Sequence, residues 1–403
     1  MNWIQQVLKQ HEEVESPREF WRWSALATLS AVVKDQVWLN RGGLYKLYPN
    51  IYVMLHADSG LKKGPPVSMS KQIVKNVNNT RIISGRSSIQ GILKELGTAY
   101  TIPGGKVINK SVGFIVASEF SSSLVSDPAA MTILTDLYDR HWNAGEYRSL
   151  LKMETFELKD PTISMLVATN EAHFEDFIGK KDIQGGFIGR MFVIAEDKVQ
   201  KLNPLVQMLE NPPDYVKLSE FPKEVSKLTG EFKYGPGAGE LYEQWYMQFY
   251  RALFDSPNKD TTGTVQRFGD SVLKVAMLLS LGEKLELILT EENINEAIDI
   301  CEKLVQNVKR TTLGKEGKSE DALQKALIIK ELCFREPHSI SRAMMLKKHW
   351  MDFKSDTIDP IAEDLAKGGI IEVKSIGNQV VYTMNDETAQ MYSEFFRSRG
   401  VKK

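Results

Sequence analysis

A basic, glycine-containing segment at residues 57–64 has the residue types needed to bind a phosphate. It reads Ala-Asp-Ser-Gly-Leu-Lys-Lys-Gly and follows residues 51–55, an apolar run that predicts a buried parallel strand. Glycine lets backbone amides turn toward phosphate oxygens, a following helix offers its positive N-terminal end, and a lysine reaches the outer phosphates. The segment therefore predicts a phosphate-binding loop with Lys63 as its lysine.

The match of this loop to the pattern G-x-x-x-x-G-K-[ST] is incomplete. Ala57 stands at the first glycine, Lys62 at the second, and Gly64 at the Ser/Thr position. An ordinary strand, turn and helix with a basic turn is therefore the alternative interpretation. The candidate nucleotide-binding residues are Ser59, Gly60, Lys62, Lys63 and Gly64.

Polar residues end two further predicted strands. The run at 112–120 reaches Glu119, and the run at 163–170 ends at Asn170. A carboxylate at the tip of the strand beside the phosphate loop can polarise the attacking water and help to hold magnesium, and Asn170 can orient that water. Ser118 stands where an aspartate is usual, so Ser118 and Glu119 are the candidate metal ligands. A strand that merely ends on an exposed glutamate is the alternative.

Two arginines have positions suited to a phosphate. Arg190 follows a glycine-containing loop and precedes the apolar run 191–195, and Arg267 lies at the solvent end of a buried helix predicted over 265–281. Guanidinium forms bidentate, charge-assisted bonds to phosphate, so Arg190 suits a phosphate in a neighbouring subunit. A surface arginine at a strand start is the alternative for Arg190.

Composition limits the class of protein. The 403 residues, 42% of them hydrophobic, are enough for two or three domains with a sizeable core. Lys+Arg 51 against Asp+Glu 52 gives a net charge of -1, so any nucleic-acid site must be a local patch. Cys301 and Cys333, the two cysteines, lie in apolar helical patterns, which disfavours a disulfide framework and fits a cytoplasmic setting. Neither a signal peptide nor an apolar run of about 20 residues is present, so no membrane partner is expected.

The pattern of elements predicts an α/β fold with a parallel sheet. Helices are predicted over 322–334, 339–350 and 356–367, followed by strands at 370–374 and 379–383, and this combination indicates a winged helix. The predicted segments are an N-terminal helical lead-in (1–48), an ATPase core (49–200), a linker and helical lid (201–313), a winged helix (318–390) and a basic tail (391–403).

The order of these motifs resembles that of the AAA+ ATPases of the minichromosome-maintenance type, particularly the related replicative helicases of phages and mobile elements. The resemblance rests on Leu-Val-Ala-Thr-Asn at 166–170 for sensor 1, on 189–194 for the arginine finger and its strand, and on 265–267 with 288–297 for the lid. It extends over roughly residues 15 to 390. The fold that it implies is a P-loop ATPase core with a helical lid and a C-terminal winged helix.

The resemblance also implies an ATP hydrolase that uses ATP and Mg²⁺. In it Lys63 binds phosphate, Glu119 activates water and Asn170 is the sensor. Arg190 and Arg267 complete the site from a neighbouring subunit. Such proteins work as hexameric rings around single-stranded or forked DNA, so a helicase that replicates a phage or mobile element is expected, with other replication proteins as partners.

Two departures from the family pattern leave other functions open. Gly64 removes the hydroxyl that usually ligates magnesium, and Ser118 replaces the usual aspartate. ATP hydrolysis is then slow, uses Ser118 or Ser68 as a substitute for these lost groups, or is absent. The alternatives are an ATP-binding module that binds or loads onto DNA and switches without unwinding, and a scaffold with an inactive nucleotide site.

Lysines in two predicted hairpins are candidate DNA contacts. Lys106 and Lys110 lie in the hairpin at 101–110, and Lys152 lies at the tip of the hairpin at 145–158. They would bind backbone phosphates without reading sequence, although solvated loop charges are an equal alternative. The recognition helix of the winged unit is acidic, which favours packing in the ring or a protein partner. Within this unit and its tail, only Lys374 and the residues from 397 onward have a charge that suits contact with DNA.

Overall fold

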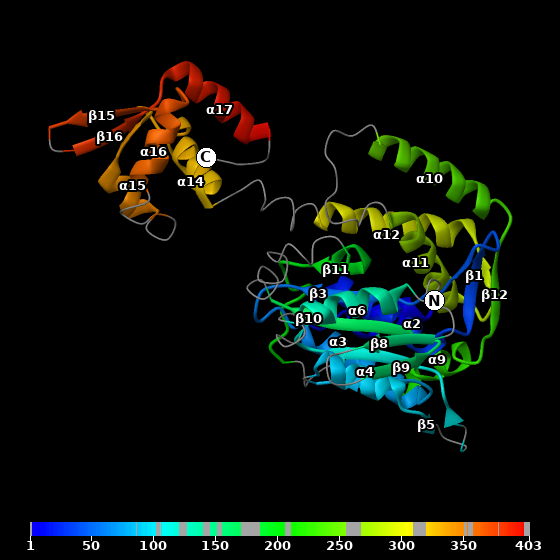
Figure 1. The fold of residues 1–403 in the computed structure, drawn as a ribbon. Helices are drawn as coiled ribbons and strands as arrows, with labels where there is room; N and C mark the ends of the chain where they lie inside the picture. The colour runs from blue at the N-terminus through cyan, green and yellow to red at the C-terminus, as the bar shows by residue number, and fades with distance from the viewer. Residues whose placement is uncertain are drawn as a thin grey trace. The chain divides into compact units, whose positions relative to one another are not determined.

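The computed structural model describes residues 2–85, 87–101, 105, 107–120, 127–139, 146–150, 155–170, 186–205, 211–254, 267–308, 320–349, 353, 358–377 and 379–398. The chain divides into two compact units, Met1–Val308 and Lys309–Lys403 (Figure 1). The predicted lead-in, the core and nearly all of the lid segment fall within the first unit.

A five-stranded parallel sheet forms the centre of the first unit. Its strand order is β11 (Met191–Ala195), β3 (Tyr52–His56), β10 (Thr162–Thr169), β7 (Val112–Ala117) and β4 (Arg81–Ser84). Every residue of β3 and β10 is buried, which explains why these strands are continuous apolar runs without polar alternation. The predicted parallel sheet is thus confirmed, and β4 is a strand that the sequence pattern did not predict.

The path of the chain gives β3 its two neighbours. After β3 the chain forms α3 (Gly64–Val77) and crosses to β4 at the far edge, then returns through α4 (Ile89–Gly97), β7 and α6 (Pro128–Tyr138) to β10. It then passes β3 and forms β11 on the other side. Because the order reverses around β3, the carboxyl ends of β10 and β11 flank the loop that follows β3.

This order corrects one expectation of the sequence analysis. The strand that carries Glu119 was expected directly beside the phosphate loop, but β10 lies between β3 and β7. The reason is that consecutive strands enter the sheet from its far edge, so the last strand of the return path is the one that reaches β3. Asn170 is therefore one strand from the loop, and Glu119 is two strands from it.

The N-terminal helices belong to the main core. The first helix, α1 (Trp3–Gln10), is capped by Asn2 and followed by α2 (Arg18–Val33), which contacts α3, β3, β10 and β11. Two buried hydroxyl pairs tie α2 to its neighbours: Thr28 to Ser70 of α3 and Ser30 to Ser164 of β10, each with an oxygen–oxygen distance of 2.7 Å. The predicted lead-in is thus packed against the sheet.

A second sheet joins the N-terminal segment to the segment predicted as linker and lid. Its order is β13 (Ile288–Leu289), β12 (Gly230–Tyr234), β1 (Val37–Arg41) and β2 (Tyr45–Leu47), with β1 and β12 parallel. The helices of this region are α8 (Tyr215–Leu218), α9 (Glu220–Val225), α10 (Ala238–Phe254), α11 (Phe268–Glu283) and α12 (Glu291–Val308). Pairing between β1 and β12 explains why both segments share one core.

Two short antiparallel ladders confirm the predicted hairpins. They pair β5 (Tyr100–Thr101) with β6 (Val107–Ile108), and β8 (Glu146–Leu150) with β9 (Thr155–Lys159). The sequence also predicts a helical patch at 173–178, which lies outside the described residues.

In its described residues, the second unit has three helices and a three-stranded antiparallel sheet, followed by one further helix. The order is α14 (Glu320–Cys333), β14 (Ser339–Ser341), α15 (Arg342–Lys348), α16 (Ile358–Lys367), β15 (Glu372–Ile376), β16 (Gln379–Thr383) and α17 (Asp386–Ser398). The helix expected from residue 339 begins later, because residues 339–341 pair with β16 and the Ser341 hydroxyl then caps α15 by accepting from the Met344 amide. The final helix α17 covers much of the segment predicted as a tail.

Candidate functional site

The loop after β3 has a bent backbone held by the N-terminal segment. Gly60 and Lys62 both adopt positive φ, 97° and 50°, and the second is uncommon for a residue with a side chain. The Ser16 hydroxyl donates to the Lys62 carbonyl at 2.7 Å, and Glu15 pairs with the Lys62 ammonium at 3.5 Å. The loop tip, which includes Ser59 and Gly60, is exposed.

The Lys63 ammonium curls back over this loop. Its Nζ donates to the carbonyl oxygens of Ala57 at 2.6 Å and Asp58 at 2.8 Å. Burial lowers the pKa of Lys63, and the charges of Asp58 and Glu119 oppose that shift. Lys63 is thus within electrostatic reach of Glu119, and its hydrogen bonds go to backbone oxygens that a phosphate could replace.

The start of α3 is poor in hydrogen-bond donors. The helix begins at Gly64 and continues with Pro65 and Pro66, which have no N–H groups. A helix offers about four free N–H groups at its start, so the two prolines remove about half of them. Gly64 supplies no hydroxyl, although a Cβ there would meet no atom within 4 Å. The loop therefore has a lysine and a bend, but only part of the usual set of amide donors.

The polar strand tips lie at the same edge of the sheet as this loop. The Ala57 amide donates to the Thr169 carbonyl at 3.4 Å, and the Phe120 amide donates to the Ala168 carbonyl at 2.7 Å. These bonds hold the ends of β3, β10 and β7 together, so Asn170 and Glu119 follow directly on the joined ends. Both Ser118 and Glu119 are exposed. The residues that sequence analysis assigned to phosphate binding, water activation and sensing are thus brought to one edge.

Arg190 lies at the opposite edge. It ends the short helix η1 (Ile188–Arg190) and directly precedes Met191, which pairs with Tyr52 at the start of β3. A five-residue strand spans about 13 Å, so Arg190 and Lys63 cannot meet on one phosphate within one chain. Lys63, Glu119 and Asn170 thus share one edge of the sheet, and Arg190 lies at the other.

The Arg190 guanidinium is held by its own chain. Its Nε donates to Asp139 Oδ2 at 2.8 Å, its Nη1 donates to the Gly186 carbonyl at 2.8 Å, and its Nη2 also contacts Asp139. Its side chain is 11% exposed. In this arrangement Arg190 is a wall of an internal pocket rather than a projecting arginine.

This pocket has a volume of about 320 Å³ and is lined by several charged and aromatic side chains. Its lining includes Arg41, Tyr45, Tyr138, Asp139, Arg190, Tyr246, Tyr250, Arg267, Asp270 and Lys274. Arg267, predicted as a lid residue, is the N-cap of α11 and one of these walls. We refer to this site as the arginine pocket.

Lys274 is one of the residues of this pocket that sequence analysis missed. Only 3% of it is exposed, and its Nζ donates to the backbone oxygen of Asn50 at 3.0 Å and to Asn50 Oδ1 at 2.9 Å. The ammonium also lies 3.8 Å from the centroid of the Tyr138 ring. Burial lowers the pKa of Lys274 to about 7. The available signal was a single lysine inside the apolar run of α11.

The predicted DNA-binding lysines have limited support. Lys106 and Lys152 lie outside the described residues. Lys110 is half-exposed and forms an ion pair with the nearly buried Asp35 at 2.6 Å, and Lys374 pairs with Glu372 at 2.6 Å. Part of the charge of Lys110 and Lys374 is therefore already neutralised.

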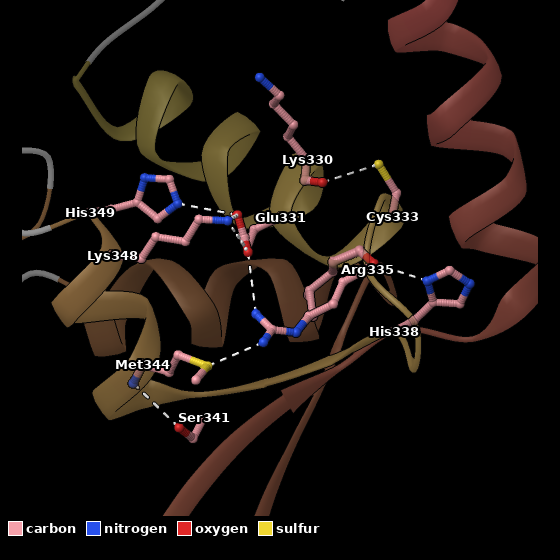
Figure 2. Close-up of polar contacts among 10 residues, drawn as sticks. Lys330, Glu331, Cys333, Arg335, His338, Ser341, Met344, Lys348 and His349 are labelled. Atoms are coloured by element: carbon pink, nitrogen blue, oxygen red, sulfur yellow. Dashed lines mark hydrogen bonds and ion pairs between the residues drawn. The ribbon is translucent and has the colours of Figure 1, made fainter. Parts of the chain in front are cut away.

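A carboxylate organises the basic side chains of the second unit. Glu331 accepts from Lys348 at 2.8 Å and from Arg335 at 3.3 Å, and its other oxygen lies 3.3 Å from His349 Nε2 (Figure 2). Burial alone would raise the pKa of Glu331, but hydrogen bonds from Lys348 and His349 lower it.

The acidic helix α16 is also paired within the unit. Arg342 donates to both oxygens of Asp359, at 2.7 and 3.0 Å, and Lys325 contacts Asp364 at 3.1 Å. The hydrogen bond from Arg342 lowers the pKa of Asp359. Two of the acidic side chains that argued against DNA contact are thus partners of bases on α14 and α15.

Comparisons with known proteins give no family assignment. No protein-family model matches the chain, and a search of curated proteins gives no significant match. In the described parts of the chain, no helix is both long and apolar enough to cross a membrane. The same residues include no cluster of three or more histidine, cysteine or acidic side chains arranged to hold a metal.

Proposed function

We propose that this chain is an ATP-dependent, ring-forming DNA helicase or translocase that acts in replication of a phage or mobile element. One observation carries the nucleotide-binding part of this proposal. The strand order reverses around β3, so the Lys63 loop, Asn170 and Glu119 share the carboxyl edge of a parallel sheet, which is where ligands bind in open α/β sheets.

Each residue at this edge has a definite task in the proposal. Lys63 exchanges its two backbone carbonyl partners for the outer phosphate oxygens of ATP. Glu119, exposed and near Lys63, accepts a proton from the attacking water, and Asn170 donates to that water or to the terminal phosphate. Magnesium neutralises charge on the phosphates when bound, and the oxygen ligands of Ser118 and Glu119 suit it.

The arginines fit this proposal only across a subunit boundary. Arg190 and Arg267 lie at the opposite edge from Lys63, so they would serve the nucleotide of a neighbouring copy. Arg190 would then have to break its hydrogen bond to Asp139 before it could bind the neighbouring nucleotide. Ring assembly would have to supply the free energy for that step. The hexamer, the DNA partner and the cytoplasmic setting follow from the family resemblance.

The second unit supports a winged-helix assignment. Its order of helix, strand, two helices and a hairpin agrees with the winged helix predicted from the sequence, apart from the added strand β14 and helix α17. Because α16 carries acidic side chains paired with Arg342 and Lys325, we propose that it contacts protein rather than DNA phosphates.

A second candidate function is a nucleotide-binding switch that does not hydrolyse ATP. Gly64, Pro65 and Pro66 favour it, because they remove the usual magnesium-ligating hydroxyl and two amide donors from the site where the β- and γ-phosphates would bind. A switch needs only nucleotide affinity, whereas catalysis needs donors that stabilise the charge of the transition state.

The deciding experiment is ATP hydrolysis with and without single-stranded DNA, using the native chain, Lys63→Ala and Glu119→Gln. The motor proposal predicts DNA-stimulated turnover that falls about 100-fold or more in both variants, with ATP binding retained in Glu119→Gln. A native chain that binds ATP and does not hydrolyse it would support the switch instead.

Oligomeric state gives an independent check. Size-exclusion chromatography with light scattering, with and without ATP, should show a ring assembly that depends on nucleotide. A chain that stays monomeric under both conditions would argue against the ring and for a scaffold or switch.

A further inference from the structure

The arginine pocket has an excess of positive charge. Among the described residues that line it, the cations are Arg41, Arg190, Arg267 and Lys274, and the carboxylates are Asp139 and Asp270. Four cations less two carboxylates leave an excess of two charges when Lys274 is protonated. Water screens such charges less at a partly buried site than at an open surface.

Both carboxylates already have partners in the pocket wall. Asp139 accepts from Arg190 at 2.8 Å. Asp270 accepts from the Tyr45 hydroxyl at 2.9 Å and lies 3.7 Å from Arg41 Nε. They hold two arginines in place, and the described lining as a whole still has more cations than carboxylates.

The pocket also has flat aromatic walls. Tyr246 and Tyr250 lie on one face of α10 with ring centroids 4.3 Å apart, and the Tyr250 hydroxyl accepts from the Gly269 amide at 3.2 Å. Tyr138 forms another wall beneath Lys274. A volume of about 320 Å³ is within the range of small-molecule sites. The walls suit a ring and the cations suit an anion.

We propose that the arginine pocket binds a small phosphomonoester that carries an aromatic ring. The phosphate lies between Arg267 and Lys274, and the ring packs against the tyrosines. This inference concerns a ligand held within one chain and does not depend on ATP hydrolysis or on ring formation.

Charge balance favours a phosphomonoester over a monoanion. A phosphomonoester carries close to two negative charges near neutral pH, because its second pKa is about 6. It therefore matches the excess of two cations over carboxylates in the described lining, whereas a sulfate ester or a carboxylate brings one negative charge fewer. Guanidinium also binds phosphate through paired, charge-assisted hydrogen bonds.

Because Lys274 can gain a proton, ligand binding in the arginine pocket should depend on pH. Its ammonium faces Tyr138 and Asp139 from the end of α6, Arg190 from η1, and Asp270 on its own helix, and Arg41 and Arg267 are the other charges of the lining. A bound dianion favours the protonated amine. At pH 8, where much of Lys274 is neutral, we expect phosphomonoester binding to take up as much as about one proton.

The test is isothermal titration calorimetry of the full chain with phenyl phosphate and with phenyl sulfate, its monoanionic counterpart of similar shape. We expect phenyl phosphate to bind at least about tenfold more tightly. Titrations at pH 8 in buffers of different ionisation enthalpy should show the proton uptake.

Variants locate the bound phosphate. Arg267→Gln should weaken phenyl phosphate binding about tenfold or more, whereas Asp139→Asn should strengthen it, since it removes a carboxylate and releases Arg190. Arg251→Gln, at an exposed arginine of α10, is the matched control and should change nothing. The gain in Asp139→Asn separates ligand binding from a structural role, because loss of a structural ion pair would not tighten binding.

Lys63→Ala separates this site from the nucleotide loop. The proposal predicts unchanged phenyl phosphate binding in this variant. It is overturned if Lys63→Ala abolishes binding while Arg267→Gln retains it, if the two esters bind equally, or if neither binds. The last outcome would leave the arginines for a neighbouring subunit's nucleotide.

Discussion

The two edges of the central sheet use the same chemical groups in different surroundings. At the carboxyl edge the Lys63 loop is open, lacks two amide donors and has exposed polar tips beside it. At the amino edge the arginine pocket is lined by four cations and two carboxylates. A recognisable pattern in the sequence thus marks the open edge, whereas at the other edge it indicated Arg190 and Arg267 without the pocket that they line. Motif spacing and local charge are separate indicators of a site.

The two lysines make this difference concrete. Lys63 is half-buried and donates to the carbonyls of Ala57 and Asp58, which a ligand can replace. Lys274 is almost fully buried and donates to both oxygens of Asn50, which also donates its amide to the Tyr138 carbonyl at 3.0 Å. Burial lowers the pKa of both lysines, that of Lys274 to about 7. Lys63 is thus a partly exposed ammonium on backbone carbonyls, and Lys274 is a buried, pH-sensitive one.

The largest expected effect is at the open edge. Lys63→Ala should lower ATP affinity about 100-fold, because it removes charge-assisted bonds to phosphate worth roughly 2–3 kcal/mol. Titration with a fluorescent ATP analogue measures this loss. Lys71→Ala, at an exposed lysine of the helix α3 that follows the loop, is the control. Equal losses in the two variants would remove the special role of Lys63.

The next largest effect is expected at Lys274 in the arginine pocket. The folded state holds Lys274 with a pKa of about 7, while the unfolded chain keeps the ordinary value of 10.5. Between these values the unfolded state binds more protons, so the free energy of unfolding should rise with pH by up to about 1.4 kcal/mol per unit.

Urea unfolding followed by tryptophan fluorescence at several pH values from 7 to 10 measures this slope. Lys274→Met should flatten it, and the exposed substitution Lys71→Met should leave it unchanged. A native chain whose stability does not rise over this range would contradict the buried, partly neutral amine.

A smaller effect is expected from restoring a hydroxyl side chain at position 64 of the phosphate-binding loop. Gly64→Ser adds a hydroxyl where a new Cβ meets nothing within 4 Å, so we expect magnesium-dependent ATP affinity to rise about tenfold. Gly64→Ala adds the same Cβ without the hydroxyl and is the matched control. If both variants bind alike, the gain does not come from a magnesium ligand.

The smallest expected effect concerns the amide donors that the prolines remove from the start of α3. Pro65 is exposed at the start of α3, and Pro65→Ala restores one amide there. A neutral hydrogen bond contributes about 1 kcal/mol, so nucleotide affinity should rise about threefold to fivefold. Pro17→Ala restores an amide at the start of α2 and should not change affinity. An unchanged affinity in Pro65→Ala would mean that this amide does not face the phosphate.

Much of the fold followed from local pattern. The four apolar runs at β3, β7, β10 and β11 were predicted as strands because buried parallel strands are apolar on both faces. β4 was missed because it is short and contains only two apolar residues, Ile82 and Ile83, between polar ends. α17 was missed because its mixed composition resembled a tail, although its spacing is amphipathic.

By itself, the sequence determined which residues end each strand and which loop is basic, because residue type and spacing act locally. It therefore indicated Lys63, Glu119, Asn170 and Arg190 as polar ends of apolar runs. Only the tertiary structure decided which of these ends meet, since strand order depends on packing between segments far apart in the chain. That order put β10 beside the loop, separated Arg190 from Lys63, and buried Lys274 in a pocket that no local pattern could reveal.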